Sequence, residues 1–250
     1  MPTDPWFYAV AAVAVFSVGV SKGGFGGAGA IIGVPLLAIF VTPFAAVGIM
    51  LPILLAMDAV AVWSYRKTFD RKVIWMMLPG GLVGSALAWM VAANVSVDLM
   101  RLLVGVLGLS FIAFHYLRPK DMPAANHSPV RGNIAGAGSG FTSFLAHAGG
   151  PPFQIYTIPL KLEPVIYAGT GAVFFAIINA IKVVPYLTLN QLTWDTFVTS
   201  MILLPWAVVS TYIGVFLVKI IDQKLYYQIV FTLLFLVSTK LVWDGATGLL

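Results

Sequence analysis

The sequence contains no cysteine and has few charged residues. The absence of cysteine excludes disulfide bonds, thiolate zinc sites and catalysis by a thiol. Charged residues make up only 9% of the 250 residues, whereas apolar residues make up 60% and the mean hydropathy is +0.96. A water-soluble domain with this composition would aggregate, so the chain is predicted to be an integral membrane protein that lies in the lipid bilayer.

Acidic residues are fewer than basic ones, which gives a net charge of +5. No basic run is long enough to follow a phosphate backbone, so nucleic acid is not expected as a partner. In a membrane protein, basic residues instead report which loops are cytoplasmic. The first five residues lack the basic region of a cleavable signal peptide, and none is predicted.

Six apolar segments are long enough to cross a bilayer, which requires about 20 residues of helix. The predicted spans are residues 44–65, 73–93, 97–117, 164–188, 193–218 and 223–243. Two other apolar segments, 6–40 and 133–162, are interrupted by small residues and proline. Each should form two pieces of about 10 to 16 residues, either as two short spans or as a re-entrant hairpin. The predicted fold class is an all-α membrane protein with about eight transmembrane helices.

Basic residues gather in three connections between the predicted spans. They are Arg66, Lys67, Arg71 and Lys72; then Arg118, Lys120 and Arg131; and finally Lys219 and Lys224. The positive-inside rule places these connections in the cytoplasm. Both termini are then predicted to be extracytoplasmic, and the two interrupted segments enter the membrane from opposite sides.

The chain divides into two halves of similar plan, residues 1–117 and 132–250, joined by a cytoplasmic linker at 118–131. Each half has one broken hairpin followed by three spans, and the charges give the halves opposite orientations. At an offset of 121, four positions agree in residue type or polarity: Gly29 with Gly150, Pro43 with Pro164, Gly48 with Gly169, and Asp58 with Asn179. Such inverted repeats are typical of secondary transporters.

The two breaks read SKGGFGGAG (21–29) and HAGGPP (147–152). Under the repeat they approach each other near the middle of the membrane, where unpaired backbone groups must be buried in protein or line a wet cavity. Short helices that end there direct N–H groups and a positive dipole end into the cavity. The breaks therefore predict a binding site for a small anion.

Polar residues within the apolar segments are the further candidates, because such residues are rare in membrane spans. Lys22 follows fifteen uncharged residues, and its ammonium either reaches back to water or faces the cavity. Lys182 and Asn179 share a helix face, which favours a polar cavity there. Asp58, the one acid deep within a predicted span, is expected to pair with Lys22 or Lys182, or to carry a coupling proton.

His147 opens the second break and is predicted to be a neutral hydrogen-bonding group rather than a proton relay. It has no second histidine or cysteine nearby, so no metal site is expected, and no cofactor is predicted. The predicted anion-binding residues are Lys22, Gly24, Gly26, Gly27, His147, Gly149, Gly150, Gln154, Asn179 and Lys182. Asp58 is assigned to an ion pair or to coupling.

Three stretches in order along the chain resemble the sulfite exporter TauE/SafE family, also called the TSUP transporters. They are the glycine-rich break leading to PLL (35–37), GSGFTSFLAHAGGPP (138–152) and NAIK (179–182). The first break, GGFGGAGAIIG, departs from the more continuous glycine run with proline that is usual in the family. The resemblance implies a bacterial inner-membrane transporter that exports sulfite, sulfoacetate or other organosulfonates.

Other functions remain open at this stage. A passive anion channel with the same cavity, or a transporter of another small carboxylate or oxyanion, fits the same residues. An intramembrane enzyme has less support, because Asp58 with His147 is the only catalytic arrangement that the sequence offers. A homo-oligomer is compatible with the sequence, which does not define the oligomeric state.

Overall fold

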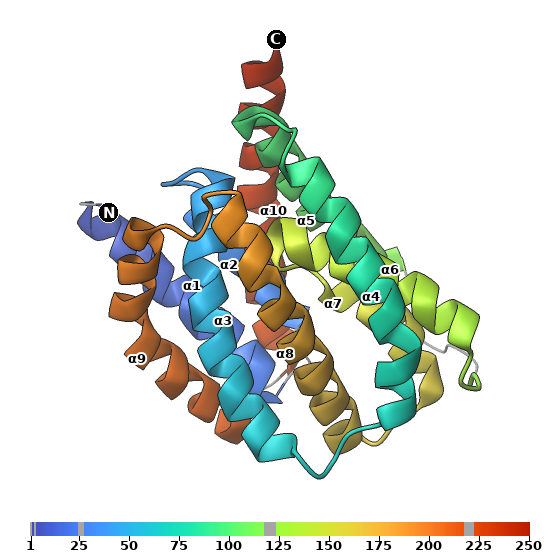
Figure 1. The fold of residues 1–250 in the computed structure, drawn as a ribbon. Helices are drawn as coiled ribbons and strands as arrows, with labels where there is room; N and C mark the ends of the chain where they lie inside the picture. Colours follow the sequence, from blue (N-terminus) through green and yellow to red (C-terminus); the bar gives the residue numbers. More distant parts are fainter. Residues whose placement is uncertain (1, 3, 25–27, 118–123, 218–222) are drawn as a thin grey trace.

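The computed structural model describes residues 2, 4–24, 28–117, 124–217 and 223–250, with the backbone alone for a few of these beside the gaps. Within these residues all regular structure is helical (Figure 1). Seven of the described helices are long and apolar enough to cross a membrane. They are α1 (Pro5–Gly24), α3 (Pro43–Tyr65), α4 (Arg71–Ala92), α5 (Val97–Leu117), α8 (Pro164–Thr188), α9 (Trp194–Leu217) and α10 (Gln223–Leu249). The predicted all-α membrane fold is confirmed.

The shorter elements belong to the two interrupted segments. They are η1 (Ala28–Ile32), α2 (Gly33–Leu37), α6 (Pro129–Ala146), α7 (Gly150–Thr157) and η2 (Ile158–Leu160). Helix α6 has 18 residues but is less apolar than the seven long helices, since it includes Arg131 and Asn133. This is why seven helices, rather than about eight, meet the criterion for a span among the described residues.

The interrupted segments differ from the prediction in one respect. Their first arms, α1 and α6, are 20 and 18 residues long, so the expected length of about 10 to 16 residues was wrong for these two arms. Residues 6–20 contain no helix breaker, and α1 continues through Lys22 before it ends at Gly24. Three glycines of α6, Gly132, Gly136 and Gly140, pack closely against α4 within the helix. The second arms are short, as expected of broken hairpins.

The six predicted spans correspond to α3, α4, α5, α8, α9 and α10, with ends that agree within two residues except for α10, which continues from 243 to Leu249. Local signals account for several starts. Thr42 accepts a hydrogen bond from the Ala45 N–H and caps α3, and Ser128 caps α6 in the same way. Pro43 and Pro164 occupy first-turn positions, where proline is tolerated.

Glycine allows α4 and α6 to cross with their backbones in contact. A Cβ atom added to Gly80 or Gly84 would lie within 2.0 Å of a carbonyl oxygen of α6. Added to Gly136 or Gly140, it would lie within 2.1 Å of a carbonyl oxygen of α4. This is the packing of small residues that membrane helices use in place of a hydrophobic driving force. Helix α1 packs on α9 through Gly19 in a similar way.

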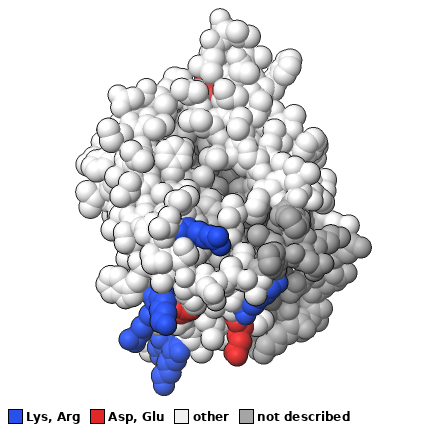
Figure 2. Space-filling model, turned by 90° about the vertical axis from the view of Figure 1, so that its right-hand side faces the viewer, with Lys and Arg blue, Asp and Glu red and all other residues white. Residues whose placement is uncertain are grey.

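The helices are arranged so that α3 and α8 lie side by side at the centre, with α1 and α9 on one flank and α4 and α6 on the other (Figure 1). Both termini lie in the upper half of this view, and the connection from α3 to α4 lies at the bottom. On the face shown in Figure 2, lysine and arginine gather toward the same lower end. The two ends of the molecule therefore differ in charge.

Asp70 is the N-cap residue of α4, at the basic end of the molecule. Its carboxylate accepts hydrogen bonds from the N–H groups of Lys72, at 2.8 Å, and Val73, at 3.1 Å, and its Oδ2 lies 3.0 Å from Nε2 of His127. Partial burial acts to raise the pKa of this carboxyl. The hydrogen bonds from Val73 and His127, together with the charge on His127, outweigh burial and lower the pKa of Asp70 below its ordinary value.

A lowered pKa in the folded protein has a predictable effect on stability. The contribution of Asp70 is fully present above its unfolded pKa of about 4 and is lost as the pH falls through the folded value. We therefore expect the thermal unfolding temperature of the purified protein to fall more steeply below about pH 4 than that of the variant Asp70→Asn. Parallel curves for the two proteins would show that the ionised carboxylate does not stabilise α4.

Candidate functional site

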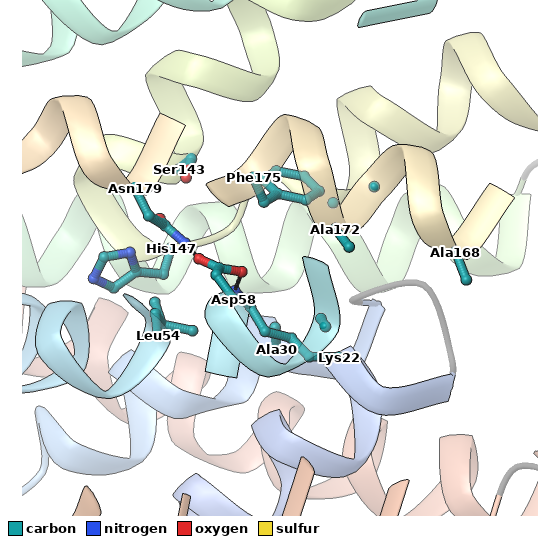
Figure 3. A pocket seen from close by; sticks show the side chains of 13 residues that line it. Lys22, Ala30, Leu54, Asp58, Ser143, His147, Ala168, Ala172, Phe175 and Asn179 are labelled. Carbon is teal, nitrogen blue, oxygen red and sulfur yellow. Dashed lines mark hydrogen bonds and ion pairs between the residues drawn. The ribbon is translucent and has the colours of Figure 1, made fainter. Parts of the chain in front are cut away.

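A cavity of about 40 Å³ lies between α1, α3, α8 and the turn from α6 to α7 (Figure 3). Its polar wall consists of Lys22, Asp58, Ser143, His147 and Asn179. The remaining lining residues are small or apolar: Ala30, Leu54, Ala61, Gly150, Ala168, Gly171, Ala172 and Phe175. A cavity of this size holds a few water molecules or one small ion, whereas sites for drug-sized ligands occupy about 300 Å³ or more.

Asp58 lies at the centre of the polar wall and has two partners. Its Oδ1 forms an ion pair with the ammonium of Lys22, at the end of α1. Its Oδ2 accepts a hydrogen bond of 2.6 Å from the amide of Asn179, on α8. Because both oxygens act as acceptors, the arrangement is that of an ionised carboxylate. Figure 3 shows the three side chains converging from three helices.

This geometry decides between the two interpretations of Lys22. Its side chain is only 10% exposed and points toward Asp58 and the cavity, so the ammonium does not extend to water. Of the two partners expected for Asp58, Lys22 is the one in contact. Two further ion pairs are local to helix ends, Asp98 with Arg101 and Lys240 with Asp244.

Lys182 lies behind the cavity wall. It is fully buried and is not among the residues that line the cavity. Its Nζ lies 3.0 Å from the carbonyl oxygen and 3.1 Å from the hydroxyl of Ser143, and 2.8 Å from Nδ1 of His147. These three acceptors match the three N–H donors of an ammonium. The structure thus places Lys182 against Ser143 and His147, and not in the direct contact with the cavity that the sequence suggested.

The position of Lys182 has an electrostatic reason. Ser143 is in the last turn of α6, where the backbone carbonyls form the negative end of the helix dipole. A buried ammonium that donates to one of these carbonyls is stabilised by that dipole. Lys182 therefore fixes the end of α6, and the Ser143 hydroxyl that accepts from it forms part of the cavity wall.

His147 ends α6 in the left-handed conformation, with φ of 51°. Its Nδ1 accepts a hydrogen bond from Lys182, so Nε2 must carry the ring proton, and Nε2 lies 3.1 Å from the carbonyl oxygen of Val47. An imidazolium would have no acceptor for its Nδ1 proton, because an ammonium only donates. The contacts match the neutral, hydrogen-bonding histidine predicted from the sequence.

The other predicted site residues are distributed as follows. Gly150, the first residue of α7, lines the cavity. Gly149 does not; it packs so closely that an added Cβ would lie 2.7 Å from the Phe175 ring and from a backbone oxygen. Gln154 is buried away from the cavity lining. Gly24 ends α1.

Two predicted residues, Gly26 and Gly27, lie outside the described residues.

Sequence reasoning missed the face of α8 that forms one side of the cavity. This face consists of Ala168, Gly171, Ala172, Phe175 and Asn179. The other four lie four, seven, eight and eleven residues before Asn179, which follows the helical period, so extending the Asn179 face toward the start of the predicted span would have identified them. The small side chains leave the space that the cavity occupies.

The cavity extends toward the basic end of the molecule. Ala168 lies in the second turn of α8 and Ala61 in the last turns of α3, and both helices reach the connection to α4 at the bottom of Figure 1. On the opposite side, the His147 ring closes the cavity through its contact with Val47. The site is thus closer to access from the basic end than from the end that carries the termini.

Comparison with known protein families finds a match over most of the chain. The family model of the sulfite exporter TauE/SafE matches residues 11–241. No curated protein and no solved structure matches the chain. The matched range includes both chain breaks and every residue that lines the cavity. The chain therefore belongs to the sulfite exporter TauE/SafE family.

Proposed function

We propose that this protein is a secondary transporter that exports sulfite or another small sulfur-containing anion across the bacterial inner membrane. The observation that carries the proposal is the balance of charge around the cavity. Two lysines are present, Lys22 in the cavity wall and Lys182 behind it, and one acid, Asp58, pairs with Lys22. Lysines are rare and costly inside a membrane, so two of them around one small cavity favour an anionic ligand.

Several groups are suited to hold the anion. The ammonium of Lys22 and the hydroxyl of Ser143 both line the cavity, and a hydroxyl that accepts from Lys182 can still donate its own proton. Gly150, the first residue of α7, lines the same space and offers its N–H, whereas Pro151 and Pro152 have none and the Phe153 N–H donates to Gly149. Coulombic attraction is stronger here than at the surface, because little water screens it. The small cavity favours sulfite and the smallest sulfonates, such as methanesulfonate, over larger organosulfonates in this conformation.

The inverted repeat is part of the proposal, and several contacts support it. Gly48 in α3 packs on the carbonyl of Gln191, before α9, and Gly169 in α8 packs on the carbonyl of Thr68, before α4. Helix α1 contacts α9 as α6 contacts α4, while α3 meets α8 and α5 meets α10. Exchanging the two halves leaves this contact pattern unchanged. Alternating access would then follow from motion of one half relative to the other.

We infer the orientation of the protein in the membrane from the distribution of its charges. If the basic end is cytoplasmic, as the positive-inside rule requires, the cavity opens toward the cytoplasm and both termini are extracytoplasmic. This conformation would accept a substrate from the side on which an exporter must load it. A direct contact closes the other side, between His147 and the backbone of α3.

The test is transport by the purified protein in liposomes loaded with radiolabelled sulfite. We expect the efflux of labelled sulfite to be saturable. Unlabelled sulfite outside the liposomes should accelerate this efflux, because a carrier that has bound substrate returns to the inward-facing conformation faster than an empty one. Lys240→Met, which alters an exposed pair at the far end of α10, is the matched control and should transport like the wild type. No flux above that of empty liposomes would overturn the proposal, and ohmic current without acceleration would favour a channel.

A further inference from the structure

The lysine that lines the cavity is already paired with a carboxylate of the protein. Among the described residues that line the cavity, Lys22 is the one with an ammonium group, and it is paired with Asp58. The ammonium of Lys182 already has three acceptors in Ser143 and His147. A substrate anion entering this space therefore needs the charge that Asp58 now neutralises.

The anion and the Asp58 carboxylate cannot both remain ionised beside Lys22 without a large electrostatic penalty. Both would lie in one small, poorly hydrated space, where like charges strongly favour uptake of a proton by one of them. The charged and titratable groups around Asp58 are Lys22 from α1, Lys182 from α8 and His147 from the turn after α6. His147 is held neutral and Lys182 is engaged, so neither replaces Lys22 as its partner.

We propose that Asp58 is a proton-binding site and that its protonation releases Lys22 to bind the substrate anion. This inference rests on the proposed function. The proton adds to Oδ1, the oxygen that now accepts from Lys22, while Oδ2 keeps its hydrogen bond from Asn179. The neutral carboxyl then donates its O–H, and Lys22 directs its charge to the anion. One proton is bound with each anion.

The structure provides a separate approach for the proton. A second hollow of about 400 Å³ lies beside α3 and runs from Trp63 and Arg66, at the basic end of that helix, to Asp58. Asp58 is the one residue that lines both this hollow and the cavity, among the described residues. Its other walls are mostly apolar, so a water that brings a proton to Asp58 would pass along Arg66, the other charged residue of the hollow.

The test is calorimetric binding of methanesulfonate, an anion that stays ionised near neutral pH, to the purified protein. Sulfite itself changes its protonation state near neutral pH, so its own proton exchange would add to that of the protein. We expect the affinity to rise about tenfold for each unit by which the pH falls, over the range in which free Asp58 is ionised. The dependence of the binding heat on buffer ionisation should give about one proton taken up per anion.

Two variants separate Asp58 from other titrating groups. In Asp58→Asn, which has nearly the same shape, the anion should bind with an affinity that does not change with pH and without proton uptake. Asp98→Asn removes an acid from a partly exposed pair and should behave like the wild type. If Asp58→Asn fails to fold, the proton count in the wild type still decides.

The outcomes distinguish this inference from the function on which it rests. Binding by the wild type without proton uptake, or an unchanged pH dependence in Asp58→Asn, would overturn the inference and leave the anion site standing. Absence of binding at any pH by methanesulfonate and sulfite alike would count against the proposed function, and the inference would fall with it.

Discussion

Replacement of Lys22 by methionine should abolish anion binding and lower the stability of the protein. Methionine keeps much of the side-chain length but removes the ammonium, so the Asp58 carboxylate stays buried with only the hydrogen bond from Asn179 among the described residues. Breaking a buried ion pair on one side costs about 3–5 kcal/mol. For a chain of this size, about 2–4 °C of unfolding temperature corresponds to each kcal/mol, so a fall of about 10 °C is expected in detergent.

The double variant Lys22→Met with Asp58→Asn separates the two effects. It removes both members of the pair and leaves no unpaired charge, so it should recover most of the lost stability. It should not recover the binding of sulfite, because the cavity has lost its ammonium. The exposed pair of Lys240 with Asp244 is the control, where Lys240→Met should change stability by less than about 1 kcal/mol. Wild-type binding in the double variant would remove Lys22 from the site.

Replacement of Gly84 by alanine should prevent stable folding. Glycine to alanine within a helix ordinarily stabilises it by about 1 kcal/mol. At Gly84, however, the added Cβ would lie 1.9 Å from the carbonyl oxygen of Ala137, a backbone atom that cannot rotate away. The two helices would have to separate, and since α4 and α6 share a long crossing we expect a loss above about 4 kcal/mol, measured as the fraction of monodisperse protein after extraction.

A second glycine provides the comparison. At Gly171, in the middle of α8, the nearest atoms to an added Cβ lie 3.5 Å away on the ring of Phe153, which is an ordinary contact. Gly171→Ala should therefore leave the unfolding temperature equal or slightly higher. Equal yields for Gly84→Ala and Gly171→Ala would mean that the crossing of α4 and α6 tolerates separation.

Much of the helical plan could be predicted from the sequence, because apolar length and first-turn prolines are local properties. Pro43 and Pro164 stand at or next to the starts predicted for α3 and α8. The length of α6 was not predictable in this way. Its glycines resemble helix breakers in isolation, and they are helical because α4 packs directly on them.

The contacts of the candidate site were likewise only partly predictable from the sequence. The pair of Lys22 and Asp58 could be anticipated, because a buried acid in a membrane needs a cation and few were available. The place of Lys182 could not, since its acceptors on Ser143 and His147 are 39 and 35 residues away and depend on how α6 ends. In the sequence, a buried lysine that donates to the end of a helix cannot be distinguished from a buried lysine that binds a ligand.

The hydrogen bond between Asp58 and Asn179 joins positions 121 residues apart, the offset that relates the proposed halves. If a two-fold axis relates the two halves, a residue near that axis lies opposite the equivalent residue of the other half. In a dimer of identical half-chains, two aspartates here would repel each other, and two asparagines would leave the neighbouring lysine without a carboxylate. Fusion of the halves into one polypeptide lets the two positions differ. It thereby permits a single acid next to the two-fold axis. A dimer of identical half-chains would place either two acids or none there.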